Sequence, residues 1–316
     1  FQEFVKAALM FIILVNVITT DRRLNLMFLL TIGVSCMLSF AAIRDYASGQ
    51  LVGERVMGIV GNHFDNPNAL SLHLVTILPI VFGLSLGARN AFKKTVMVVC
   101  ALLMIGGIFV SFSRGGFLGF GASMAFLAWK LRSRNRAVVI ILLVCSIILL
   151  VILIPTGQGM RILSIFNPSL DPTGSASQRQ ALLWRSIIVA LRHPLLGIGI
   201  GNFPIMGVQA LSTHNSYTQV ASEMGMAALA LYVAFIVTPF KGLISVERSA
   251  ADKMGDLRYY YLAIGIQASL VAYIVSSFFA HVAYQWYVYY LVAYAVSIRI
   301  IFARHVSESE RRTSSQ

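Results

Sequence analysis

The segment 179–223 carries most of the side chains that could do acid–base and anion chemistry. Within it, His214 is followed directly by Asn215 and, two residues later, by Tyr217. An imidazole near its usual pKa of about 6.5 is mostly neutral at physiological pH and can accept a proton from a hydroxyl group. Arg179 adds a guanidinium, which suits bidentate binding of phosphate oxygens. The segment predicts a general base beside an anion site, and the alternative is a histidine that only anchors a loop to a helix end.

Arg114 is a second candidate for anion binding. It stands in the sequence Ser-Arg-Gly-Gly, residues 113–116, between two apolar stretches. An arginine within a membrane protein is costly to bury without an anionic partner, and two glycines let the backbone approach a phosphate or another segment closely. We therefore expect Arg114 to bind a diphosphate. The alternative is a charge that extends to water and only sets the topology.

Glycine occupies three alternate positions in the run 194–203. The spacing G-x-G-x-G differs from a dinucleotide-binding fingerprint, no predicted strand precedes it, and Phe203-Pro204 follows in place of a helix. A dinucleotide site is therefore excluded. The glycines instead predict a tight loop that brings Asn202 and His214 toward the membrane surface.

Glu223 lies about two turns into the helix predicted after His214, where a carboxylate should face the interior of a helix bundle. We expect it to orient a substrate or to pair with Arg114. The acidic residues predicted on the same side of the membrane stand far apart and form no Asp-x-Asp pair that could hold a cation on a diphosphate; they are Asp45, Glu54, Asp65 and Asp171. The sequence therefore predicts no metal ion and no other cofactor.

The composition is that of an integral membrane protein. Hydrophobic residues make up 58% of the 316 residues and charged residues 12%, and the mean hydropathy is +0.78. A soluble domain needs more polar surface. A spanning helix needs roughly 20 mostly apolar residues, and about nine runs qualify on that criterion: 5–20, 24–43, 69–88, 95–112, 115–131, 137–154, 217–240, 259–280 and 282–302. The predicted fold is an all-α, polytopic transmembrane bundle.

The net charge of +13 could suggest a nucleic-acid partner, but its placement argues otherwise. When the runs are threaded through a bilayer, most Lys and Arg residues fall on one face, and the positive-inside rule makes that face cytoplasmic. We therefore expect these charges to set the topology and to contact membrane lipids, with no nucleic acid bound. The segment 155–216 then lies on the outer side.

The predicted organisation has four parts. They are N-terminal spans in 1–154, an outer loop in 155–216 that holds the candidate site and short interfacial helices, C-terminal spans in 217–303, and a cytoplasmic tail in 304–316. The chain begins at Phe1 rather than Met and shows no signal-peptide pattern, so we expect further spans upstream.

Local signals place two helix ends near the candidate site. A helix that begins at Ser175 or Ser177 should stop at Pro194, which cannot continue it. Its mixture of apolar side chains, Trp and Arg suits a helix at the lipid–water interface. Ser216 with Gln219 forms a capping-box pattern, which predicts that the next span starts one residue after Ser216.

Five short motifs follow one another along the chain. They are Asn-Pro-Asn at 66–68, Ser-Arg-Gly-Gly at 113–116, Arg179 with Trp184, the run 194–203, and His-Asn-Ser-Tyr at 214–217 with Glu-Met-Gly at 223–225. Their types and order over about residues 60–226 resemble the O-antigen ligase and polysaccharide polymerase family. The resemblance implies glycan transfer from a polyprenyl diphosphate lipid to a glycan or lipid acceptor. It also implies a multi-pass protein of the bacterial plasma membrane with its site on the periplasmic or extracellular side.

The resemblance also implies roles for single residues. His214 would be the general base, and Arg114 and Arg179 would hold the diphosphate in place of a cation. The remaining substrate contacts would come from Asn202, Asn215, Tyr217 and Glu223. The expected reaction is a single displacement with inversion at the anomeric carbon.

Other readings stay open at this point. A ligase, which hands a finished glycan to another molecule, and a polymerase, which extends the glycan, would use the same base and diphosphate site. A transporter for a small anion would also use outward arginines, although paired broken helices and ionisable groups near span midpoints are typical of transporters. A non-catalytic scaffold for glycan assembly would tolerate loss of His214.

Overall fold

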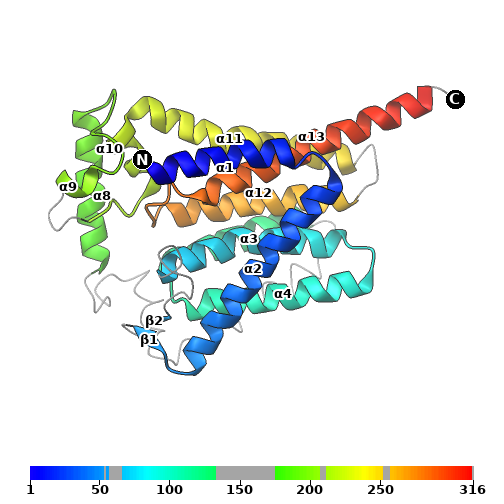
Figure 1. The fold of residues 1–316 in the computed structure, drawn as a ribbon, viewed down its shortest axis with the longest axis horizontal. Coiled ribbons are helices and arrows are strands. Elements are labelled where there is room, and N and C mark those ends of the chain that lie inside the picture. The colour runs from blue at the N-terminus through cyan, green and yellow to red at the C-terminus, as the bar shows by residue number, and fades with distance from the viewer. Residues whose placement is uncertain (53–54, 57–65, 133–174, 207–210, 252–256, 315–316) are drawn as a thin grey trace.

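The computed structural model describes residues 1–52, 55–56, 66–132, 175–206, 211–251 and 257–314. Within these ranges the regular structure is helical apart from two short antiparallel strands (Figure 1). The elements are α1 Gln2–Val17, α2 Asp21–Ala47, β1 Leu51–Val52, β2 Arg55–Val56, α3 Pro67–Gly87, α4 Ala91–Val110, α5 Arg114–Leu131, α8 Ser175–Arg192, α9 Phe203–Met206, α10 Ser216–Met224, α11 Met226–Ser249, α12 Leu257–Ser277 and α13 Trp286–Ser314.

Six of the described helices are long and apolar enough to cross a membrane, namely α2, α3, α4, α11, α12 and α13. The prediction of an all-α, multi-pass membrane protein is confirmed by this finding. The predicted count of nine spans stays a prediction, because the run 137–154 lies outside the described residues. The runs 5–20 and 115–131 form α1 and α5, which are helical but are not among the six.

The predicted bounds of one span are wrong. The run 217–240 is divided between α10 and α11, and Gly225 separates them with a φ of +89°. A residue in that left-handed region cannot continue a right-handed helix, and glycine adopts it without steric cost. The membrane-crossing helix is therefore α11, and α10 is a separate short helix at its start.

The helices α3 and α12 form the centre of the bundle. Their apolar windows are each 78% buried, against 28% for α4 and 17% for α11, so α4 and α11 present most of their apolar surface outward. The two central helices approach closely at Gly83 and Gly265, where an added Cβ would lie 2.7 Å from a carbonyl oxygen of the other helix. Small residues permit such close packing between spanning helices.

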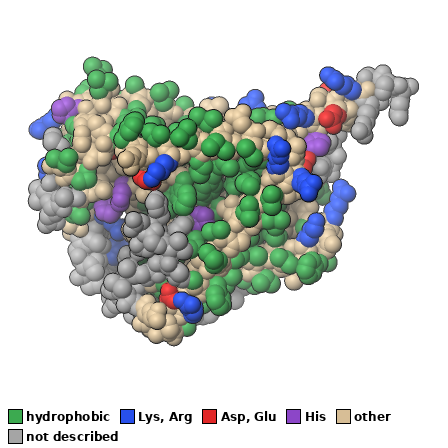
Figure 2. All heavy atoms as spheres, viewed as in Figure 1, with side chains coloured by type: hydrophobic (Ala, Val, Ile, Leu, Met, Phe, Trp, Pro, Cys, Tyr) green, Lys and Arg blue, Asp and Glu red, His purple; other side chains and the backbone are tan. Residues whose placement is uncertain are grey.

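The bundle has two different ends. We call the end that carries α8, α9, α10 and the segment 278–285 the loop end, and the end with the turns 18–20 and 88–90 the basic end. Figure 1 shows that α8 runs across the loop end while the spanning helices run along the molecule, with the C-terminal part of α13 projecting from the basic end. In Figure 2, Lys and Arg side chains gather toward the basic end, and hydrophobic side chains cover much of the face between the ends.

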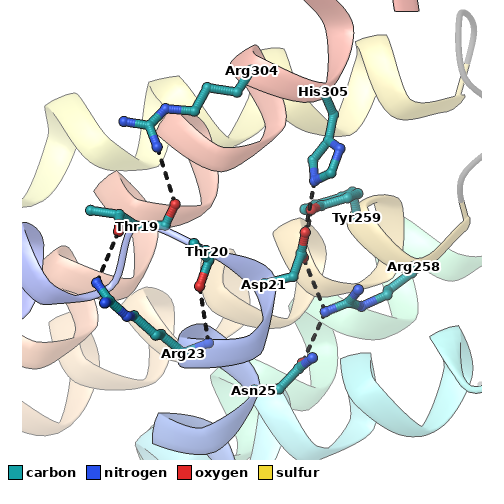
Figure 3. Close-up of polar contacts among 9 residues, drawn as sticks. All are labelled: Thr19, Thr20, Asp21, Arg23, Asn25, Arg258, Tyr259, Arg304 and His305. Atoms are coloured by element: carbon teal, nitrogen blue, oxygen red, sulfur yellow. Dashed lines mark hydrogen bonds and ion pairs between the residues drawn. The ribbon is translucent and has the colours of Figure 1, made fainter. Parts of the chain in front are cut away.

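Polar contacts at the basic end fasten three helices together (Figure 3). Asp21 at the start of α2 accepts a hydrogen bond from the Tyr259 hydroxyl at 2.7 Å, and its other oxygen lies 2.7 Å from His305 Nε2. Arg258 lies 3.3 Å from the same carboxylate and donates to the Asn25 side chain at 2.9 Å. Since these residues come from α2, α12 and α13, the carboxylate joins three separate parts of the chain.

Candidate active site

His214 lies at the loop end, directly before α10, and is half-buried. Its backbone has a φ of +52°, which is uncommon for a residue other than glycine, although histidine tolerates it better than most. Such a conformation costs free energy and persists where surrounding contacts fix it. The ring of His214 is therefore held in a defined place rather than carried on a free loop.

Asn215 caps α10 in place of the predicted capping box. Its side-chain oxygen accepts hydrogen bonds from the backbone N–H groups of Tyr217 at 2.9 Å and Thr218 at 3.0 Å. The prediction that Ser216 with Gln219 would cap this helix is wrong, because the Ser216 hydroxyl donates instead to the carbonyl of Ala280 at 2.7 Å. The helix begins at Ser216, as expected within one residue.

The start of α10 is joined to the segment 278–285 by side-chain hydrogen bonds. Besides the bond from Ser216 to Ala280, the amide nitrogen of Asn215 donates to the Phe278 carbonyl at 3.1 Å, and the backbone N–H of Val282 donates to the Ser216 hydroxyl at 3.0 Å. Asn215 is buried and both ends of its amide are engaged. Its predicted contact with substrate stays a prediction, and the structure gives it a positioning role.

Tyr217 points toward α12. Its hydroxyl donates to the Ile274 carbonyl at 3.0 Å and accepts from the Ser277 hydroxyl at 3.3 Å. These contacts fasten the first turn of α10 to the last turn of α12. The predicted substrate contact of Tyr217 likewise stays a prediction.

His281 lies beside His214, which the sequence did not predict. The two ring centroids are 5.1 Å apart with an interplanar angle of 83°, an edge-to-face arrangement. In the sequence, His281 belongs to no motif and stands far along the chain from His214. No local signal could have found it, since the hydrogen bonds that bring the two segments together depend on the tertiary fold.

Burial keeps the His214 ring neutral. Partial burial, then the neighbouring His281 and then Arg179 lower the pKa of His214 to about 4, and burial also lowers the pKa of His281. A positive charge on either ring is disfavoured because desolvation penalises the charged form. Arg179 is thus close enough to act on the ring electrostatically, and the pairing of a base with an anion site stays a prediction.

Arg179 is carried by α8, which packs against α10. The helix ends at Arg192, as the position of Pro194 predicted. Its inner face is buried at Leu182 and Val189, whereas Trp184 is 60% exposed. A helix that crosses the bundle end with one buried face and an exposed Trp is consistent with the predicted interfacial helix.

Arg114 is the first residue of α5 and also lies at the loop end. Ser113 caps this helix by accepting from the Gly116 N–H at 3.3 Å, and its hydroxyl donates to the Asn68 side chain at 2.9 Å. The carbonyl of Gly115 accepts from the Ser276 hydroxyl at 3.2 Å. Two of the family-like motifs, 66–68 and 113–116, therefore meet in space beside the end of α12.

The glycine-rich run lies against the break between α10 and α11. Three backbone hydrogen bonds join the two segments, at 2.8 to 2.9 Å: Ile198 N–H to Ser222, Gly199 N–H to Glu223, and Met226 N–H to Pro194. Gly197 has a φ of +64°, and a Cβ there would press against the backbone of Glu223. The predicted tight loop is thus present, and it packs on the end of α10.

Asn202 supports this loop from its exposed side. Its amide nitrogen donates to the Ile198 carbonyl at 2.8 Å, and its backbone carbonyl accepts from Ile205 in the first turn of α9. The side chain is exposed, so it remains accessible to a ligand. Its role in substrate binding stays a prediction.

Glu223 is 2% exposed. One carboxylate oxygen accepts from the Phe203 N–H at 3.3 Å, and the carboxylate also lies beside the Tyr284 hydroxyl. Burial, followed by the nearby Glu223 carboxylate, raises the pKa of Tyr284. Glu223 therefore lies next to the segment 278–285, the same segment that carries His281.

Among the residues that the structure describes, no group of three or more His, Cys, Asp or Glu side chains could hold a metal ion. The charged groups at the loop end that could meet an anion are instead guanidiniums. The prediction of a reaction without metal stays a prediction.

Comparison with known families gives one match. Residues 99–233 match a family model described as O-Antigen ligase. This range includes Arg114, Arg179, His214 and Glu223, and it covers most of the motifs on which the resemblance was based. No curated protein matches the chain.

Proposed function

Because the chain carries an O-antigen ligase domain within a multi-pass membrane protein, we propose that it transfers a glycan from a polyprenyl diphosphate carrier to an acceptor hydroxyl. The observation that best supports this proposal is the neutral His214 ring, held at the start of α10 within electrostatic reach of Arg179. A neutral imidazole can act as a base, and a guanidinium can stabilise a departing diphosphate.

The proposed reaction is a single displacement. His214 takes the proton of the acceptor hydroxyl as its oxygen attacks the anomeric carbon of the donor. The bond from that carbon to the diphosphate oxygen breaks, and its electron pair leaves with the diphosphate. Arg114 and Arg179 stabilise the charge on the leaving group, so the reaction inverts the anomeric configuration and needs no metal ion.

The remaining site residues would contact the sugars. Glu223 places a buried carboxylate beside the Tyr284 hydroxyl, and a carboxylate oxygen can accept from a sugar hydroxyl. Asn202 offers an exposed amide at the glycine loop. Asn215 and Tyr217 shape the site through their own hydrogen bonds, and any direct contact with substrate would use the remaining capacity of the Tyr217 hydroxyl.

The loop end is proposed to face the periplasm or the cell exterior, in the bacterial inner membrane. Lys and Arg gather toward the opposite end, and the positive-inside rule assigns such an end to the cytoplasm. Donor lipids and the acceptor would then meet at the outer leaflet, where α8 crosses the bundle.

Ligase and polymerase activities share the proposed chemistry and are separated by their products. Cells without the protein would accumulate long free glycan polymer if it is a ligase, and single repeat units if it is a polymerase. A glycolipid profile of such cells distinguishes the two. Transport of a small anion is the alternative class, and it predicts anion flux that does not depend on His214.

Replacement of His214 tests the proposed function. The variants His214→Gln and His214→Ala should lower glycan transfer in reconstituted vesicles by about 10²- to 10⁴-fold, the usual contribution of a general base. His305→Gln, at the basic end, is the matched control and should keep its rate per inserted molecule. Undiminished transfer by both His214 variants would remove the proposed mechanism.

A further inference from the structure

We propose that His281 is a positioning residue for His214: its ring fixes the orientation of the base and disfavours a second positive charge beside it. This inference rests on the proposed function, because it gives His281 a part in the same proton transfer. His281 belongs to none of the family-like motifs. It also lies outside residues 99–233, which match the family model.

The contact between the His214 and His281 rings is fixed by the segments that carry them. The 5.1 Å edge-to-face contact joins segments that are distant in sequence, and three hydrogen bonds through Asn215 and Ser216 hold those segments together. The bond from Ser216 ends on Ala280, the residue directly before His281. Rotation of one ring would therefore disturb a contact that the surrounding backbone already enforces.

The burial of one ring nitrogen of His281 argues against a role at the lipid interface. Its Nδ1 atom is buried and has no hydrogen-bond partner among the described residues. A buried polar atom without a partner costs about 1–3 kcal/mol, so its retention needs a reason. An interface histidine would turn that nitrogen to water.

The groups around the two rings disfavour protonation. Arg179 on α8 and Arg114 at the start of α5 bring positive charge to this end, and Tyr284 in the segment 278–285 lies beside the buried Glu223. In the described part of the chain, no ion pair joins His214 or His281 to a carboxylate. When His281 takes a proton, its charge opposes a second proton on His214, so the base stays neutral as the pH falls.

The test compares His281→Phe with His281→Ala in purified protein reconstituted into phospholipid vesicles. The assay uses a polyprenyl-diphosphate-linked glycan as donor and measures the initial transfer rate between pH 4 and 8. The Phe variant keeps a ring against His214 but cannot take a proton. At pH 7.5 we expect a rate close to that of the unaltered protein. The acid limb of the pH profile, where the rate falls as His214 takes a proton, should shift to higher pH by about one unit, because two titrating groups that interact shift each other's pKa by about this much.

The Ala variant removes the ring as well. We expect the same shift of the acid limb together with a loss of about tenfold to a hundredfold at pH 7.5, because the base is less well placed. His193→Phe, which replaces an exposed histidine at the end of α8, is the control and should leave the limb unchanged. A purely structural role for His281 would lower the yield of folded protein without moving the limb.

An unchanged acid limb in both variants overturns the proposal. The His214→Gln variant separates this failure from failure of the proposed function. If His214→Gln abolishes transfer while His281→Phe has no effect on the pH profile, only the role of His281 is refuted. If His214→Gln keeps full activity, the general-base mechanism itself fails.

Discussion

The two ends of the bundle use histidine in opposite ways. At the basic end, His305 lies 2.7 Å from the Asp21 carboxylate, which also meets Tyr259 and Arg258. At the loop end, His214 lies against a second imidazole, and Arg179 adds further positive charge. The His305 ring contacts a carboxylate, whereas burial, His281 and Arg179 lower the pKa of His214. Histidine thus joins helices at one end, and at the other end it is the proposed base.

The backbone shows the same contrast. Five of the seven described residues with positive φ lie at the loop end: Gly197, Gly199, Gly201, His214 and Gly225. Backbone in sparsely populated conformations persists where surrounding contacts fix it, and it is common at functional sites. The proposed base thus lies at the end of the bundle where residues with positive φ are concentrated.

Replacement of an arginine should give the largest difference in transfer rate between the loop end and the basic end. Arg114→Gln and Arg179→Gln should each lower the initial rate of glycan transfer by about 10²- to 10³-fold, because each removes a charge that stabilises the leaving diphosphate. Lysine at either position should restore only part of the rate, since it lacks the bidentate fork. Arg258→Gln at the basic end should leave transfer per folded molecule unchanged. Full activity of Arg179→Gln would show that the arginines of the loop end are no more important for transfer than those of the basic end.

A substitution in the glycine-rich run 194–203 should give the next largest effect on transfer. Gly197→Ala places a methyl group against the backbone of Glu223 at a φ of +64°, and such strain costs of order 1–3 kcal/mol. We expect a lower midpoint of thermal unfolding in detergent and weaker transfer, because the loop packs on the end of α10. Gly33→Ala in α2 is the matched control, since nothing lies within 4 Å of an added Cβ there. It should keep full transfer and gain about 0.5–1 kcal/mol in helix stability.

Removal of the Asp21 carboxylate should act on stability alone. Asp21→Asn leaves Arg258 and His305 without their anionic partner, and we expect a loss of about 1–2 kcal/mol in the free energy of unfolding. Glu3→Gln is the control, because the exposed pair of Glu3 with Lys6 contributes little. Thermal unfolding measures the loss, and the transfer rate per folded molecule should not change. A selective loss of transfer in Asp21→Asn would show that the two ends are coupled.

The features that the sequence predicted correctly depend on neighbours along the chain. Apolar run lengths located α2, α3, α4 and α12, and Pro194 located the end of α8. The features that it missed depend on partners distant in sequence. Ser216 does not form its capping box because the Ala280 carbonyl takes its hydroxyl, and His281 reaches His214 only through the packing of α10 on the segment 278–285. Local patterns therefore singled out His214 as the proposed base, and the fold placed His281 beside it.

The smallest expected effect is the pH dependence of the unaltered protein. Since the pKa of His214 is lowered to about 4, kcat/KM, which reports the free protein, should stay level as the pH falls from 8 to about 5 and decline only near pH 4. A solvent-exposed histidine would already lose activity near its usual pKa of about 6.5. A bound diphosphate places negative charge near the ring and raises its pKa, so kcat should decline at a higher pH than kcat/KM.

The same lowered pKa fixes the sign of the stability change. Between pH 6.5 and about 4 the unfolded chain binds a proton at His214 that the folded chain does not bind, so the free energy of unfolding should fall as the pH falls through this window. His214→Gln removes this dependence, whereas His305→Gln does not remove it. A pH profile of kcat/KM with its acid limb at 6.5, together with a stability that does not change across the window, would mean that His214 is solvated and that the loop end does not differ from the basic end in the way described.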